Sequence, residues 1–244
     1  MMVNHPSAIA VRAAILVGLV LGSPTPLRPQ AARSERSEER ARMVHEQIAR
    51  RGIEDQAVLG AMLTVPRHLF VPETHRDRAY GDHPLPIGHG QTISQPYIVA
   101  FMTELLEIEP GDRVLEVGTG SGYQAAVASM LADSVFTVEI VPELAAEAES
   151  RLERLGYRDV DVRSGDGYFG WEEHAPYDAI FVTAAAGHVP PPLVQQLVPG
   201  GRMAIPVGGP FQLQNLVLVE KAADGTVTTR SVLPVQFVPL TGGH

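Results

Sequence analysis

From residue 113 onward, short apolar runs alternate with amphipathic segments along the chain. The apolar runs predict buried strands, because each run is short and is bounded by turn residues. They cover residues 114–117, 135–140, 160–163, 178–183 and 203–207. The segments between these runs predict helices that end at about residue 132 and that cover 142–156 and 192–197. Pro142 stands at the first position of its segment and Gly156 at the end, as is typical of helix boundaries.

Buried strands that alternate with helices favour a mainly parallel sheet, because the crossover helices cover both of its faces. Two later stretches with alternating polarity, 215–220 and 226–233, flank Asp224-Gly225 and predict a terminal hairpin. We therefore predict an α/β fold: a doubly wound, Rossmann-like, mainly parallel sheet with helices on both faces and a C-terminal antiparallel hairpin.

The stretch before the strands is predicted to be helical and rich in loops. Residues 38–65 carry apolar positions at helical spacing, interrupted at Gly52, and residues 96–107 predict a second amphipathic helix. Residues 66–96 have little periodicity, so we predict loops there.

These patterns predict one folded domain at 42–244, made of an N-terminal helical region, 42–110, and a core, 111–244. The preceding residues 33–41 predict a charged linker that runs into the first helix.

Residues 1–32 differ from the rest of the chain. Arg12 precedes an apolar run at 13–22, and small residues follow near residue 32, which is the layout of a secretory signal. The apolar run is too short to cross a bilayer. Three interpretations stay open at this point: an export or membrane-tethering signal, a disordered extension, or a start codon assigned too early.

Composition restricts the chemistry that the chain can perform. It has no cysteine, which excludes disulfides, thiolate zinc sites and a cysteine nucleophile. The formal net charge is −9 although residues 1–42 are basic, so the body is acidic and disfavours nucleic acid as a partner. Several histidines lie between residues 68 and 89, but they lack helical metal-ligand spacing and a carboxylate cluster. We therefore predict no metal.

Three alternating glycines lie between a predicted strand and a predicted helix. The run Val114-Leu-Glu-Val-Gly-Thr-Gly-Ser-Gly-Tyr123 lets the backbone approach a ligand at the carboxyl edge of the sheet. A dinucleotide fingerprint, G-x-G-x-x-G, needs a third glycine where Tyr123 stands. The observed G-x-G-x-G spacing resembles the S-adenosylmethionine loop of class I methyltransferases, with a plain tight turn as the alternative. The loop residues predicted to bind the cofactor are Gly118, Thr119, Gly120, Ser121 and Gly122.

Two acidic residues after later strands support this interpretation. Glu139 follows Gly120 by about 20 residues, the usual spacing of an acid that accepts hydrogen bonds from ribose hydroxyls. Asp166 is placed to accept from an adenine amino group, and Gly167 leaves room for the ring. Each acid alone is also explained as an ordinary strand-end or turn residue. Together with the loop they favour S-adenosylmethionine over a nicotinamide dinucleotide.

Several further strings, in the same order, resemble the protein-L-isoaspartate O-methyltransferase family. They are Val65-Pro-Arg-His-Leu-Phe-Val-Pro72, Leu85-Pro-Ile-Gly-His-Gly-Gln-Thr-Ile-Ser-Gln-Pro-Tyr97, Asp166-Gly-Tyr-Phe-Gly170, Tyr177-Asp-Ala-Ile-Phe-Val-Thr183, Gly201-Arg-Met-Ala-Ile-Pro-Val207 and Val235-Gln-Phe-Val-Pro-Leu240. The resemblance covers roughly residues 42–240. It implies S-adenosylmethionine as cofactor and S-adenosylhomocysteine as product. It also implies isoaspartyl-containing polypeptides as substrates, whose free carboxylate is methylated so that repair begins.

In that family a Thr-Ile-Ser segment holds the active-site serine and lines the substrate pocket, and the matching residues here are Thr92, Ile93 and Ser94. From the residues alone, Ser94 also fits as the N-cap of the helix that begins near Pro96, and the two roles are compatible. His89 is predicted to border the pocket. Because a carboxylate nucleophile is already ionised at pH 7, no general base is needed, and we predict that Ser94 positions the substrate.

Three alternative functions stay open from the sequence: a methyltransferase acting on another carboxylate or small molecule, an NAD-linked oxidoreductase, and a non-catalytic S-adenosylmethionine-binding module. The resemblance implies a cytoplasmic enzyme, whereas residues 1–32 leave export to the periplasm or membrane tethering open. We expect the protein to act as a monomer.

Overall fold

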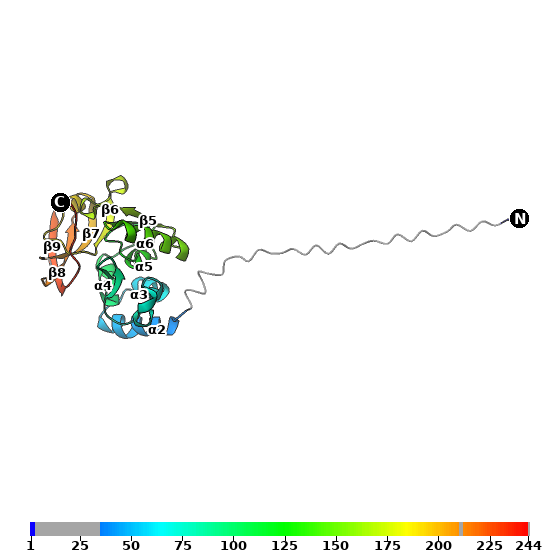
Figure 1. Ribbon diagram of the computed structural model, residues 1–244. Coiled ribbons are helices and arrows are strands. Elements are labelled where there is room, and N and C mark those ends of the chain that lie inside the picture. Colours follow the sequence, from blue (N-terminus) through cyan, green and yellow to red (C-terminus); the bar gives the residue numbers. More distant parts are fainter. Residues whose placement is uncertain (3–34, 210–211, 244) are drawn as a thin grey trace.

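The computed structural model describes residues 1–2, 35–209 and 212–243, and a seven-stranded sheet forms its centre (Figure 1). The strand order is β5-β4-β3-β6-β7-β8-β9. The bounds are β3 (Arg113–Val117), β4 (Ser134–Glu139), β5 (Val160–Ser164), β6 (Tyr177–Val182), β7 (Leu197–Val207), β8 (Gln214–Lys221) and β9 (Val227–Val235). The prediction for residues 1–32 lies outside the described residues except at Met1 and Met2.

The pairing of the strands confirms the predicted fold class. β5, β4, β3, β6 and β7 pair in parallel, and β8 and β9 add an antiparallel hairpin at one edge. The chain runs from β3 to β4 on one side and later to β6 on the other side. The carboxyl end of β3 therefore lies where the strand order reverses, which is the place where open α/β sheets bind ligands.

Side chains of the central strands alternate between two hydrophobic cores. Val114 belongs to one core and Leu115 to the other, and neighbouring β6 repeats the alternation at Ala179 and Ile180. All four residues are almost completely buried. Because successive side chains of a strand point to opposite faces, both faces of the sheet are covered, as its apolar strands predicted.

Some helices pack against this sheet, and those of the N-terminal region lie below it in the view of Figure 1. Their bounds are α2 (Ser37–Arg42), α3 (Gln56–Thr64), α4 (Pro96–Leu105), α5 (Tyr123–Ala128), α6 (Pro142–Leu155) and α7 (Pro191–Gln195). The predicted boundaries of α6 are confirmed, with Pro142 in its first turn and Gly156 as the C-cap. Regular α5 is shorter than predicted, and turn-type bonds continue it as far as the amide of Ala132, which donates to Ala128 O over 3.0 Å.

The N-terminal region is more irregular than the predicted helix over 38–65. α2 is followed by a π-helical turn at Met43–Ile48 and a 3-10 turn at Ala49–Arg51, which ends at Gly52. Helical structure begins at Ser37, inside the segment predicted as a linker, where Arg36 bonds the carboxylate of Glu39 over 2.7 Å. Acidic residues in the first turn also stabilise a helix start through its dipole.

Residues 66–96 contain a small sheet that the sequence pattern did not reveal. β1 (Leu85–Gly88) and β2 (Gln91–Ile93) pair antiparallel around a turn that holds His89. Both strands are very short, so no alternation long enough to indicate them exists in the sequence. Two 3-10 segments, Arg67–Leu69 and Glu73–Arg78, precede the small sheet.

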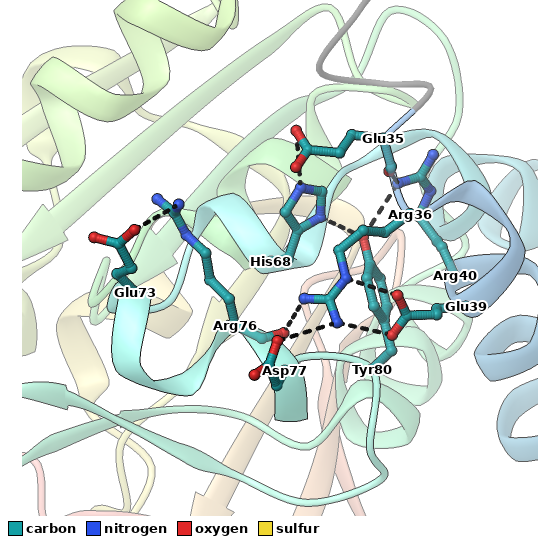
Figure 2. A network of polar contacts seen from close by, with 9 residues as sticks. All are labelled: Glu35, Arg36, Glu39, Arg40, His68, Glu73, Arg76, Asp77 and Tyr80. Carbon is teal, nitrogen blue, oxygen red and sulfur yellow. Dashed lines mark hydrogen bonds and ion pairs between the residues drawn. The ribbon is translucent and has the colours of Figure 1, made fainter.

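A polar network joins α2 to these 3-10 segments (Figure 2). The Tyr80 hydroxyl accepts from Arg40 Nη1 over 3.1 Å and lies 2.7 Å from His68 Nδ1. Because arginine only donates, the Tyr80 oxygen accepts from Arg40, and its O–H remains available to His68 Nδ1. The other ring nitrogen, Nε2, lies 3.8 Å from the Glu35 carboxylate. Burial lowers the pKa of His68, against the opposing effect of the nearby Glu35 carboxylate.

None of the helices among residues 35–209 and 212–243 is long and apolar enough to cross a membrane. Within the same residues, no three His, Asp or Glu side chains gather closely enough to hold a metal ion.

The network predicts a stability loss for Tyr80→Phe. Removing the hydroxyl leaves the buried His68 and Arg40 nitrogens without this partner, which should lower the free energy of unfolding by about 1–3 kcal/mol. Urea unfolding at pH 7 measures this change. The matched control is Tyr97→Phe, which keeps the ring that stacks on Arg51. An equal free energy for Tyr80→Phe and the native protein would contradict the network's role.

Candidate functional site

A cavity lies at the carboxyl ends of β3, β4 and β6, where the strand order reverses. We call it the glycine-loop cavity. It is lined by the loop Gly118–Ser121, the acids Glu116 and Glu139, the segment Gln91–Ser94, and the C-terminal residues Val238–Thr241. The structure thus gathers one strand-end loop, two carboxylates and two segments distant in sequence around a single space.

The first glycine of the loop is required by a close contact with β6. Gly118 has φ 98°, and a Cβ there would lie 2.5 Å from Thr183 Oγ1. The Thr183 hydroxyl in turn donates to Gly118 O over 2.6 Å. Any side chain at 118 would therefore both strain the backbone and separate the loop from the end of β6. Thr183 lines the cavity and was missed as a site residue, although its place after a buried parallel strand was a usable signal.

Polar side chains hold the rest of the loop in place. Buried Thr119 bonds Thr137 over 2.6 Å between the two Oγ1 atoms. The Ser121 carbonyl accepts from Arg151 Nη1 over 2.9 Å. Gly122 is the N-cap of α5, so the loop enters the helix directly, as predicted.

Glu139 joins the glycine loop to the start of α6. Its Oε2 accepts from Gly120 N over 2.7 Å and its Oε1 accepts from Val141 N over 3.0 Å. The residue is buried and lines the cavity at the end of β4. Because each carboxylate oxygen has a second lone pair, Glu139 retains capacity for a ligand hydroxyl. The ribose contact expected of it stays a prediction.

Glu116 is a second carboxylate in the cavity wall and was missed by the sequence reasoning. It is only 1% exposed, and its Oε2 accepts from Thr137 Oγ1 over 2.6 Å, while Oε1 has no hydrogen-bond partner within the described residues. Burial raises its pKa to about 8, against the opposing effect of the Thr137 bond, and nearby Glu139 raises it further. A charged residue inside an otherwise apolar strand was the available signal.

Asp166 and Gly167 differ in their position relative to the glycine-loop cavity. Gly167 lines the cavity, and a Cβ there would lie 2.5 Å from Val117 Cγ1, so only glycine fits. The Asp166 carboxylate accepts from Tyr168 N and from Gly243 N, each over 3.0 Å. It thus holds the C-terminal segment beside the cavity, and its adenine contact stays a prediction.

Ser94 lies between β2 and α4 and is not the N-cap of that helix. The N-cap is Gln95, whose side chain makes no capping hydrogen bond. The backbone amide of Tyr97 donates to Asp82 Oδ1 over 3.3 Å. The capping role predicted for Ser94 is therefore wrong, because a carboxylate from an earlier loop supplies it. Thr92, Ile93 and Ser94 all line the glycine-loop cavity.

A second cavity adjoins the first, and we call it the neutral cleft. Its lining residues are Pro84, Thr92, Ser94, Gln95, Ile98, Thr183, Leu213 and Pro234–Val238. Within the part of the chain that the structure describes, none of the lining residues is charged. Thr92, Ser94, Thr183 and Val238 line both cavities, so they form the boundary between the two spaces. His89, exposed at the β1–β2 turn, lines neither cavity, so the structure does not bring it together with Ser94.

The charges of the glycine-loop cavity discriminate between the candidate cofactors. Among residues 35–209 and 212–243, its lining contains two carboxyl groups and no Lys, Arg or His. A dinucleotide carries an anionic pyrophosphate, whereas S-adenosylmethionine carries a sulfonium, an ammonium and a carboxylate group and has a net positive charge. The partnerless Glu116 Oε1 fits a cationic donor, so the wall suits the sulfonium cofactor and opposes the dinucleotide.

The raised pKa of Glu116 predicts a pH-dependent stability. The folded protein holds a proton that an unfolded glutamate releases near pH 4.5, so stability falls as pH rises from about 4.5 to 8. Glu116→Gln cannot titrate, so relative to the native protein its free energy of unfolding should rise by on the order of 3 kcal/mol between pH 5 and pH 8. Urea unfolding at the two pH values measures this, with exposed Glu149→Gln as the control. A pH-independent difference would contradict a neutral Glu116.

Comparisons with known proteins agree with this geometry. The model of the family "Protein-L-isoaspartate(D-aspartate) O-methyltransferase (PCMT)" matches residues 38–244. Protein-L-isoaspartate O-methyltransferase 2 of Polaromonas sp. is 65% identical over 188 residues, which cover 77% of this chain and 89% of the relative. Protein-L-isoaspartate O-methyltransferase 1 of Cupriavidus necator is 64% identical, with 78% and 73% covered.

Solved structures give the same result. A protein-L-isoaspartate O-methyltransferase superposes with TM-score 0.76 at 31% identity, covering 84% of this chain but only 66% of that chain, slightly less than two thirds. A beta-aspartate methyltransferase (PCMT) from Plasmodium falciparum, in complex with S-adenosyl-L-homocysteine, superposes with TM-score 0.71 at 27% identity, with 83% and 98% covered. This chain belongs to the protein-L-isoaspartate(D-aspartate) O-methyltransferase family.

Proposed function

We propose that this protein transfers a methyl group from S-adenosylmethionine to the free carboxylate of L-isoaspartyl residues in damaged polypeptides, which initiates their repair. The observation that carries the proposal is the meeting of two unlike cavities. An acidic cavity with a glycine loop adjoins a cleft in which no described lining residue is charged, and the two share Thr92, Ser94 and Thr183. Family membership supports the same activity.

Residues of the glycine-loop cavity would hold the cofactor. The loop Gly118–Gly122 offers backbone groups beside the start of α5, and Glu139 offers lone pairs for hydroxyl groups. Glu116 would accept from the cofactor's ammonium group, and Gly167 leaves space beside Val117. When bound, S-adenosylmethionine supplies an activated methyl group on a sulfonium centre.

Residues of the neutral cleft would bind the polypeptide. The substrate carboxylate is ionised at neutral pH and needs no general base, so the protein's task is to orient it and to exclude water. Ser94 and Thr92 present hydroxyl donors at the boundary between the cavities. The cleft's apolar members, such as Ile98 and Phe237, reduce the water around the reacting carboxylate.

The alternative substrate is another carboxylate or a small molecule, and the peptide comparison below separates the two. We further propose that the protein acts in the cytoplasm, as its sequence resemblance implies. N-terminal sequencing of the mature protein tests this, because loss of residues 1–32 would instead indicate export.

The proposed substrate predicts a difference between two matched peptides. Two synthetic peptides are compared, identical except for L-isoaspartate or L-aspartate at one position, with S-adenosylmethionine carrying a labelled methyl. We expect base-labile label on the isoaspartyl peptide only, because a carboxyl methyl ester is hydrolysed by base. If neither peptide is labelled while the cofactor still binds, the isoaspartyl substrate is wrong and the small-molecule alternative holds.

Ser94 is predicted to position the substrate carboxylate. Ser94→Ala removes a hydroxyl at the boundary of the two cavities, so kcat/KM for the isoaspartyl peptide should fall by about 10-fold or more, as for one lost hydrogen bond to a charged group. The cofactor's Kd, measured by calorimetry, should change little. Ser150→Ala on the exposed side of α6 is the control. An unchanged kcat and KM would show that Ser94 does not position the substrate.

A further inference from the structure

We propose that Asp82 is a positioning residue for methyl transfer, acting through the segment Thr92–Gln95 rather than on the substrate. The inference rests on the proposed function, because it assigns to Asp82 the placement of the Ser94 hydroxyl. Asp82 lines neither the glycine-loop cavity nor the neutral cleft, so it has no direct route to either bound molecule.

The carboxylate of Asp82 holds the start of α4 from outside the helix. Its Oδ1 accepts from the backbone amide of Tyr97 over 3.3 Å, and its Oδ2 accepts from the side chain of Gln95 over 2.7 Å. The first amides of a helix have no partner within the helix, and Pro96 has no amide hydrogen at all. Asp82 therefore fixes the N-cap residue and the first free amide at the same time.

Arg51 completes this arrangement from the N-terminal region. Its Nη1 donates to Asp82 Oδ2 over 2.6 Å, and its guanidinium lies 3.4 Å from the centre of the Tyr97 ring. The Asp82 carboxylate and the Tyr97 ring are thus held by one cation. We call Arg51, Asp82, Gln95 and Tyr97 the α4 clamp.

The clamp has a direct consequence for Ser94. A serine before a helix normally turns its hydroxyl toward the helix amides, since that bond stabilises the helix start. Here Asp82 already bonds the Tyr97 amide, and Gln95 occupies the N-cap position. The Ser94 hydroxyl is thereby left free for the boundary of the two cavities, which Ser94 lines on both sides.

The clamp also protects the neutrality of the cleft. Gln95 is one of the cleft's lining residues, and the carboxylate next to it would repel an incoming substrate carboxylate. The ion pair with Arg51 offsets that charge over 2.6 Å. Asp82 thus anchors the segment without adding net negative charge beside the substrate.

Asp82→Ala tests the clamp in the full-length protein. We expect kcat/KM for the isoaspartyl peptide to fall on the order of 10–100-fold, because a small displacement of a positioning group has a large effect on rate. The Kd for S-adenosylhomocysteine should stay within about twofold, because the glycine loop and Glu139 are untouched. Asp82→Asn should recover only part of the activity, since its Oδ1 still accepts from the Tyr97 amide, whereas its Nδ2 cannot accept from Gln95 or Arg51.

Asp55→Ala is the matched control. Asp55 is also a capping carboxylate, accepting from Ala57 N and Val58 N at the start of α3. It should lower the thermal midpoint by about 2–4 °C, as the loss of a cap does, while leaving kcat/KM within about twofold.

Three outcomes separate the possible failures. If Asp82→Ala matches Asp55→Ala in kcat/KM, the positioning role is wrong. If Asp82→Ala weakens the cofactor as much as the peptide, its effect is general damage and the proposal is also wrong. If the native protein does not methylate the isoaspartyl peptide at all, the proposed function is wrong. The positioning role of Asp82, which rests on that function, is then wrong as well.

Discussion

The close approach of the glycine loop to the end of β6 is the constraint on which the rest of the site depends. Gly118 lies so close to Thr183 that a Cβ atom at position 118 would not fit. The approach allows the Thr183 hydroxyl to bond the loop backbone and still line both cavities. It also brings the loop to Glu139, whose carboxylate continues the chain of bonds into α6. A loop held further away would leave the two cavities unconnected at this point.

The difference in charge between the glycine-loop cavity and the neutral cleft determines which cavity suits the cofactor and which suits the substrate. On one side, Glu116 and Glu139 belong to a wall whose described residues include no cation, which suits a positively charged cofactor. On the other side, the neutral cleft offers donors but no fixed charge to a carboxylate. The positive charge of the cofactor and the negative charge of the substrate would therefore meet only at the residues that line both cavities. The carboxylate next to the cleft, Asp82, is paired with Arg51 and does not disturb this contrast.

The sequence predicted the sheet well because buried parallel strands leave a strong apolar signal and because the glycine spacing reports a backbone requirement. The placement of Glu139 and Gly167 at the cavity followed from the same rule about strand ends. Three features escaped it for physical reasons. β1 and β2 are too short to show a period, and the capping of α4 by Asp82 is a tertiary contact between separated residues. The burial of Glu116 depends on neighbours from other strands.

The most direct test of the account is a crystal structure of the protein with S-adenosylhomocysteine and an isoaspartyl peptide bound together. The account predicts the cofactor product against the glycine loop, Glu139 and Glu116. It predicts the peptide in the neutral cleft, with its free carboxylate at Ser94 and facing the cofactor's sulfur across the boundary residues. A peptide carboxylate bound away from Ser94 and Thr183, or a cofactor outside the acidic cavity, would contradict it.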